Sequence, residues 1–433
     1  MKKIVFIIVG IVVLIGAGFF VVRQFMPPST ESTTTQSPVT TQPETPAANI
    51  ASTPPPASGS NGTIKYLSFQ TLTLSAEAAT PFEKSEVENI VANSIKPRFK
   101  GLTHIANRRI AFAIGPVSLN YDDASLRQMI RQSFEIAEAE DVAVVFHVDD
   151  SMFWENRGLS KDPKNVEWLD WSGTPNTGRE LDWGPNPAKV APQMCFTSTA
   201  VRKEVGRVAK EVIGSEIKKG IDHLKSVQKE YLFGGVIAGW ETQIGIDYAT
   251  KKYLGYCAIT AKGFSASNPP ADADREREKI VEEWVTFWAK NLADAGVDTK
   301  KIYSHITIGQ SREQLEFMKK ANPSLGTYSE LVHFAPRTVA FGQYRNPGFS
   351  LYGFPDPALY DEIKNHGSPP WAISEGDTDF SEGNTYASWE KFLGSLFNHG
   401  ATLVNIFPPG SDSKEAIAAY NKFLNGEKLS EGK

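Results

Sequence analysis

The alternation of short apolar runs with amphipathic helical stretches from residue 63 onward most constrains this chain. The runs are rich in Val, Ile, Phe and Tyr, and most are apolar without a break, as expected for strands covered on both faces. We find eight, at residues 66–72, 110–115, 142–149, 235–241, 302–309, 339–344, 371–375 and 402–407. Eight strand–helix units predict an α/β fold of the (β/α)8 TIM-barrel type. An open doubly wound sheet is the alternative, and no glycine-rich nucleotide motif supports it.

The helical stretches between the runs repeat their apolar residues on one face. After Asp123, which we expect to cap a helix, the apolar positions are Leu126, Met129, Ile130 and Phe134. This spacing predicts an amphipathic helix between the second and third strands.

A different kind of apolar segment stands at the N-terminus. Ile4 to Val22 is a run of nineteen uncharged residues, long enough for a helix of about 28 Å. The run is longer than the core of a cleavable signal peptide, which predicts an uncleaved transmembrane anchor within residues 1–25. Lys2 and Lys3 before the span, against Arg23 after it, favour an N-terminus inside the cell. We therefore expect a single-pass protein of the cell membrane, with its body outside the cytoplasm.

Residues 26–62 are dominated by Pro, Thr, Ser and Ala, and only Glu31 and Glu44 are charged. Such a composition cannot bury enough apolar surface to fold, so it predicts a disordered linker. The sequence thus divides into an anchor (1–25), a linker (26–62) and a (β/α)8 catalytic domain (63–433), which we expect to be monomeric.

Charge and cysteine content exclude several classes of protein. Forty-five Lys and Arg stand against 50 Asp and Glu, and no basic block is present, so nucleic acid is not an expected partner. Cys195 and Cys257 lack the spacing of a zinc site. Their pattern leaves open one disulfide or two buried thiols. We expect neither a metal nor an organic cofactor.

Two glutamates stand where predicted strands end. The fourth run ends in Trp240-Glu241 and the seventh in Ser374-Glu375. In a barrel, strand ends carry the catalytic groups. Hydrolysis of a glycosidic bond needs one carboxylic acid and one carboxylate and no cofactor. Glu241 and Glu375 are therefore the candidate catalytic residues, and the alternative is that both are solvated loop carboxylates.

This arrangement resembles the clan of retaining (β/α)8 glycoside hydrolases, in which the acid/base Glu ends strand 4 and the nucleophile Glu ends strand 7. The resemblance implies that Glu241 is the acid/base with a raised pKa, and that Glu375 is an ionised nucleophile. Retaining enzymes hold the two carboxyls about 5 to 5.5 Å apart, which we expect here. Trp240 stands where the clan usually has Asn, and we include it among the expected substrate contacts.

The third run supplies further candidates. His147 and Asp149 alternate along it and should face one side, where they could bind sugar hydroxyls, and Trp154 follows shortly after. The other interpretations are a metal site and a structural network around the loop.

A long loop after that strand carries Trp168, Trp171 and Trp183 among polar residues. Long loops in compact domains are usually functional, so Trp171 and Trp183 are candidates for stacking on sugar rings. The alternative is a small core beneath the loop. His305 on the fifth run and Tyr344 at the end of the sixth run complete the candidates. Tyr344 is included because the resemblance implies a strand-6 Tyr that supports the nucleophile.

Two functions remain open. One is a membrane-tethered retaining glycosidase that cleaves poly- or oligosaccharide outside the cytoplasm. The other is a non-catalytic carbohydrate-binding or cell-envelope interaction barrel. Only the first requires Glu241 and Glu375 to face each other.

Overall fold

The computed structural model describes residues 63–72, 82–99, 107–181, 188–307, 335–378, 383–407 and 412–431. The predicted anchor and linker lie outside these ranges. Among the helices within them, none combines the length and apolar character needed to cross a membrane.

The body is built on one sheet of eight parallel strands in the spatial order β7-β6-β3-β2-β1-β10-β9-β8. The strands are β1 (Lys65–Leu72), β2 (Arg108–Val117), β3 (Ala143–Val148), β6 (Phe233–Ala238), β7 (Ile302–Ser304), β8 (Gly348–Tyr352), β9 (Trp371–Asp377) and β10 (Ala401–Ile406). The end strands are joined by parallel bridges, Tyr303 to Asn346 and Ile306 to Phe349. The sheet therefore closes, which confirms the predicted eight-stranded α/β barrel over the open sheet.

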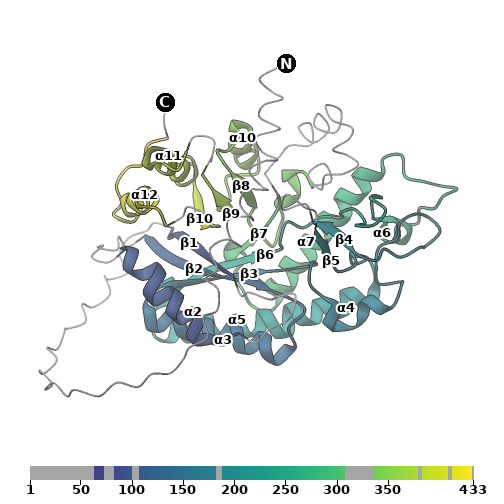
Figure 1. The fold of residues 1–433 in the computed structure, drawn as a ribbon, viewed down its shortest axis with the longest axis horizontal. Helices are drawn as coiled ribbons and strands as arrows, with labels where there is room; N and C mark the ends of the chain where they lie inside the picture. The colour runs from purple at the N-terminus through teal and green to yellow at the C-terminus, as the bar shows by residue number, and fades with distance from the viewer. Residues whose placement is uncertain are drawn as a thin grey trace, which may run out of the picture.

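Helices surround the strands, with α2, α3 and α5 on one side and α10, α11 and α12 on another (Figure 1). The α-helices are α2 (Lys84–Ile90), α3 (Asp123–Glu140), α4 (Thr199–Arg207), α5 (Ser215–Ser226), α6 (Tyr256–Ala261), α7 (Ala273–Asp294), α10 (Pro357–Asn365), α11 (Tyr386–Phe397) and α12 (Lys414–Leu424). Short π-helical segments are η1 (Val91–Ile95) and η5 (Val208–Gly214). The 3-10 turns are η2 (Lys96–Phe99), η3 (Glu155–Arg157), η4 (Leu159–Lys161), η6 (Glu230–Leu232), η7 (Thr299–Lys301) and η9 (Arg337–Ala340). After β7 the chain enters residues 308–334, outside the described ranges.

The strands are buried on both faces because apolar side chains point both ways along them. Inside the barrel, Tyr66 and Tyr303 pack among small residues such as Ala111 and Ala372. The larger cluster fills the space between strands and helices. Helix α3 begins one residue from the expected position: Asp122 is its N-cap, and its side chain accepts a hydrogen bond from the Ser125 N–H.

The sixth strand differs from the prediction. Residues 339–344 form the end of η9 and a turn, and the strand is β8 (Gly348–Tyr352) instead. The buried Arg345 guanidinium donates to the carbonyls of Val339, Ala340 and Phe341, which holds that segment as a turn. The true strand was inconspicuous because it carries a polar residue, Ser350, in its middle.

A long excursion between β3 and α4 carries the hairpin of β4 (Arg179–Leu181) and β5 (Ala188–Val190). Cys195 in this excursion forms a disulfide with Cys257 at the start of α6. The question that the sequence left open is thus decided for the disulfide, which ties the excursion to the segment after β6.

Candidate active site

Glu241 lies in a tight turn directly after β6. Gly239 has φ 120°, and a Cβ there would meet the Thr242 hydroxyl at 2.6 Å, so only glycine fits. Glu241 itself has φ 53°, a left-handed conformation that non-glycine residues seldom adopt outside special sites. The Asp150 carboxylate accepts from the Trp240 N–H at 3.3 Å and the Thr242 hydroxyl at 2.8 Å. Asp150 thus holds the turn that presents Glu241.

Glu375 lies near the carboxyl end of β9 and is buried. The register with β8 shifts beside it, between the pairs Phe349–Ile373 and Ser350–Glu375. Such bulges re-aim side chains next to active sites. The Tyr352 hydroxyl donates to Glu375 Oε1, whereas Oε2 has no hydrogen-bond partner within the described part of the chain.

Strand β8 contacts both carboxyls. Ser350 Oγ lies 2.8 Å from Glu241 Oε1, and the Tyr352 hydroxyl bonds Glu375. Ser350 and Tyr352 are two residues apart, so they face the same side of the strand. The structure therefore brings the two predicted carboxyls, which are far apart in sequence, to one end of the barrel.

Burial, and then the negative charge of Glu241, raise the pKa of Glu375 to about 8. The sequence-based expectation placed the shared proton on Glu241, and the raised pKa of Glu375 means that the two neighbouring carboxyls resist ionising together. The sequence placed an apolar Trp beside Glu241 but could not show that Glu375 is equally shielded from water. At neutral pH the two carboxyls together therefore retain one proton that solvated glutamates would have lost.

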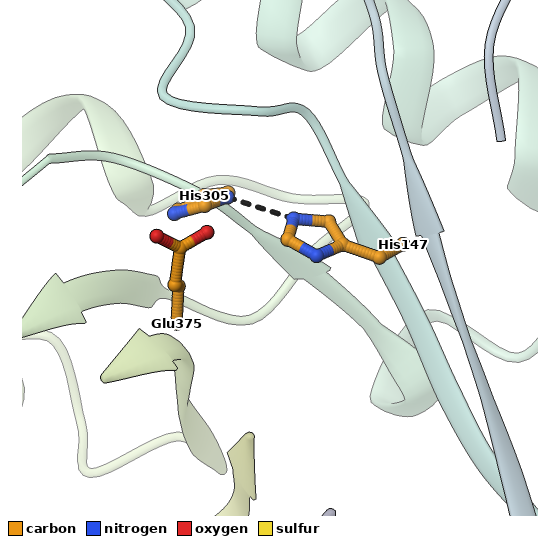
Figure 2. A group of neighbouring side chains, drawn as sticks. All are labelled: His147, His305 and Glu375. Carbon is orange, nitrogen blue, oxygen red and sulfur yellow. Dashed lines mark hydrogen bonds between the residues drawn. The ribbon is translucent and has the colours of Figure 1, made fainter. Parts of the chain in front are cut away.

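His147 and His305 form a buried pair beside these carboxyls, with the Glu375 carboxylate next to the His305 ring (Figure 2). Their rings are joined by His147 Nε2 and His305 Nδ1 at 2.9 Å. His147 Nδ1 lies 3.0 Å from Gln70 Oε1, and His305 Nε2 lies 2.6 Å from Ser350 Oγ. Burial lowers the pKa of His305 to about 3 and the pKa of His147 well below its usual range, so both rings are neutral.

The same group has the composition of a metal site. One ligand atom from each of His147, His305 and Glu375 lies within 4.8 Å of the others. However, every ring nitrogen already has a hydrogen-bond partner in the protein. A metal would have to break these bonds, so we assign none.

Asp149 and Trp240 lie at the site, but their contacts are with the protein. Both oxygens of the Asp149 carboxylate accept backbone N–H bonds, from Ser151, Met152 and Phe153 at 2.8–3.1 Å, which shapes the loop after β3. Trp240 stacks on the His147 ring at 4.0 Å with an interplanar angle of 9°.

The remaining candidates have contacts with residues other than the two carboxyls. Trp154 is buried and its indole N–H donates to the Pro192 carbonyl at 2.9 Å. Trp171 is half-buried and packs edge-on against Tyr256. Trp183 lies outside the described residues.

Tyr344 is not on the sixth strand, because that strand lies further along the chain. It is half-buried in the turn after η9, with Lys290 Nζ 5.7 Å from its ring centre. The strand-6 tyrosine that touches Glu375 is Tyr352. Sequence reasoning also missed Gln70 and Ser350, for which the only available signal was a polar residue within an apolar run.

No protein-family model and no curated protein sequence matches this chain. Similar solved structures include the catalytic domain of a β-amylase from Paenibacillus polymyxa, with 10% identity and a TM-score of 0.48 over 84% of this chain and 99% of that one. The virulence factor SghA, in complex with its substrate analog salicin, has 7% identity and a TM-score of 0.43 over 84% and 96%. Morphinone reductase has 8% identity and a TM-score of 0.38 over 85% and 88%. Because the scores are below 0.5 and the activities differ, these likenesses carry no argument about function.

Proposed function

We propose that this protein is a glycoside hydrolase that cleaves poly- or oligosaccharide by a retaining double displacement. The observation that carries the proposal is the convergence of two buried carboxyls on strand β8, Glu241 through Ser350 and Glu375 through Tyr352. Two interacting carboxyls that together keep one proton at neutral pH are what acid-assisted glycoside cleavage requires.

In the first step of the proposed reaction, Glu241 donates its proton to the glycosidic oxygen while the Glu375 carboxylate attacks the anomeric carbon. The leaving group departs as an alcohol, and a covalent glycosyl-enzyme forms. In the second step, Glu241 takes a proton from water, whose oxygen attacks the same carbon and releases Glu375. Tyr352 holds Glu375 Oε1, which leaves Oε2 for the attack.

Buried polar atoms without partners in the described part of the chain support a polyhydroxylated substrate. Several buried polar atoms at the carboxyl ends of neighbouring strands have no hydrogen-bond partner in the described ranges, and native proteins leave few such atoms. They are Gln70 Nε2, Glu375 Oε2, Asp377 Oδ2, Thr378 Oγ1 and Asn405 Oδ1. Sugar hydroxyls both donate and accept, so they can pair with donors and acceptors of both kinds.

We also propose that the barrel acts outside the cytoplasm, as a monomer held to the cell membrane by the N-terminal apolar segment. The disulfide between Cys195 and Cys257 supports this location, because such bonds persist in oxidising compartments. Protease treatment of intact cells tests it, since the barrel should be digested without lysis.

The activity is tested by screening the full-length protein, in detergent, against chromogenic glycosides and natural polysaccharides. Glu375→Gln should abolish turnover. Glu241→Ala should spare substrates with activated leaving groups, and azide should then restore the rate by replacing the missing base. The exposed Glu230→Gln is the matched control.

NMR of the first-formed product gives the stereochemical outcome, and retention of the anomeric configuration is expected. Inversion would exclude the double displacement. Saccharide binding without hydrolysis of any substrate, unaffected by Glu375→Gln, would instead identify a carbohydrate-binding barrel.

A further inference from the structure

We propose that a buried chain of hydrogen bonds, from Asn405 through Gln70, His147, His305 and Ser350, fixes each proton so that Glu241 is the carboxyl that holds the acid proton. His305 and Ser350 are then positioning residues for Glu241. The catalytic consequence rests on the proposed glycosidase function, whereas the proton arrangement does not.

The chain has a fixed starting point. The backbone carbonyl of Ser374 can only accept, so the Asn405 atom 2.9 Å from it is the amide nitrogen. The same nitrogen lies 2.8 Å from the Gln70 side chain, which must therefore present its oxygen. His147 Nδ1, at 3.0 Å from that oxygen, must then carry a proton and donate it.

The donor-to-acceptor direction of the hydrogen bonds is fixed through both rings, because each buried imidazole is neutral and has one N–H. With its proton on Nδ1, His147 accepts at Nε2, so His305 Nδ1 is the donor across the 2.9 Å contact. His305 Nε2 then accepts from the Ser350 hydroxyl at 2.6 Å. The Gly239 carbonyl also interacts with both rings and can only accept, so in this order it shares each ring's N–H proton with Gln70 Oε1 or His147 Nε2.

The hydrogen bond of Ser350 determines whether Glu241 is protonated. Its single hydroxyl hydrogen is donated to His305, so its 2.8 Å contact with Glu241 Oε1 is a hydrogen bond only if Glu241 donates. Glu241 is therefore the protonated carboxyl. Tyr352 donates to Glu375, which suits an ionised carboxylate. Burial opposes this ionisation most, and a neutral Glu241 removes the charge repulsion that adds to it.

The residues packed around these hydrogen bonds allow the side chains to meet. Strand β2 separates Gln70 on β1 from His147 on β3, and the two side chains meet because residue 115 is glycine. A Cβ at Gly115 would lie 2.8 Å from His147 Cβ and 3.0 Å from Gln70 Nε2. Trp240 covers the His147 ring.

The titratable groups facing Glu241 come from each neighbouring strand. They are His305 after β7, Tyr352 on β8 and Glu375 on β9. Asp150, after β3, contacts the residues on either side of Glu241. Of these, His305 is linked to Glu241 through the Ser350 hydroxyl.

Removal of the Ser350 hydroxyl should therefore act on Glu241 as an acid. In Ser350→Ala, protonated Glu241 loses the acceptor of its hydrogen bond, so its pKa should fall. The alkaline limb of kcat/KM should therefore move to lower pH by about one unit, which corresponds to the free energy of one buried hydrogen bond. Ser350→Thr, which keeps the hydroxyl, should retain the wild-type limb. An unchanged limb in Ser350→Ala would overturn the role of Ser350.

The proton arrangement is tested without any substrate. Long-range proton–nitrogen NMR of the full-length protein, labelled with nitrogen-15 in histidine, should show His147 and His305 neutral with the proton on Nδ1. His147→Gln and His305→Gln assign the signals. Difference infrared spectroscopy should show a protonated carboxyl stretch that Glu241→Gln removes and Glu375→Gln leaves.

Three results would overturn the proposed series of hydrogen bonds: a proton on Nε2 of either ring, a charged His305, or histidine signals that shift when Zn²⁺ alone is added. If the protein is an active glycosidase but its rings have one of these other states, the hydrogen-bond proposal fails and the proposed function stands. If the rings have the expected tautomers but the protein has no glycosidase activity, the proposed function fails and the hydrogen-bond proposal stands.

Discussion

Replacement of both buried carboxyls by the neutral amide, in Glu241→Gln/Glu375→Gln, should abolish activity and yet stabilise the fold increasingly as pH rises. In the native protein this pair keeps one proton up to about pH 8, whereas an exposed glutamate loses it near 4.5. Between these values the native state binds more protons than the unfolded chain, so wild-type stability falls with rising pH. The double variant lacks this proton and lacks the fall.

The magnitude follows from proton linkage. One proton bound by the native state alone changes the unfolding free energy by about 1.4 kcal/mol per pH unit. From pH 5 to pH 7, where the unfolded glutamate is mostly ionised and the native pair is not, the variant should gain about 2 to 3 kcal/mol over wild type. Above about pH 8 the gain should level off.

Urea unfolding followed by tryptophan fluorescence at pH 5, 6, 7 and 8 measures this gain. The matched control is Glu86→Gln/Glu230→Gln, which alters two exposed glutamates on the surface and should track wild type at each pH. A difference between variant and wild type that stays constant from pH 5 to pH 8 would refute the reasoning, because it would mean that the pair is solvated and shares no proton.

Three further results are expected. Tyr352→Phe removes the O–H that favours ionised Glu375, so the acidic limb of kcat/KM should move to higher pH by about one to two units, and an unshifted limb would contradict the contact. Gly115→Ala should lower the unfolding free energy by about 1 to 3 kcal/mol through overpacking against His147, and thermal unfolding equal to wild type would show that the strands yield freely. Trp171→Ala should weaken oligosaccharide binding by about 1 to 3 kcal/mol in calorimetry, whereas unchanged affinity with a lower melting temperature would assign this half-buried ring to packing.

What the sequence could determine by itself depends on local pattern. Apolar runs between amphipathic stretches are legible residue by residue, so seven of the eight strands and the barrel class followed from periodicity. The two glutamates stood out for the same reason, since a polar residue at the end of an apolar run is visible without any partner. The sixth strand failed because Ser350, which serves the site, interrupts the apolar pattern that marks a strand.

Tertiary structure decided which groups meet. Ser350 and Glu241 are 109 residues apart, and Asn405 and Gln70 are 335 apart, so no spacing in the sequence pairs them. Closure of the barrel brings the ends of β1, β8, β9 and β10 together and buries the polar side chains that meet there. That shared burial, which is a property of the closed barrel and of no single segment, raises the pKa of Glu375.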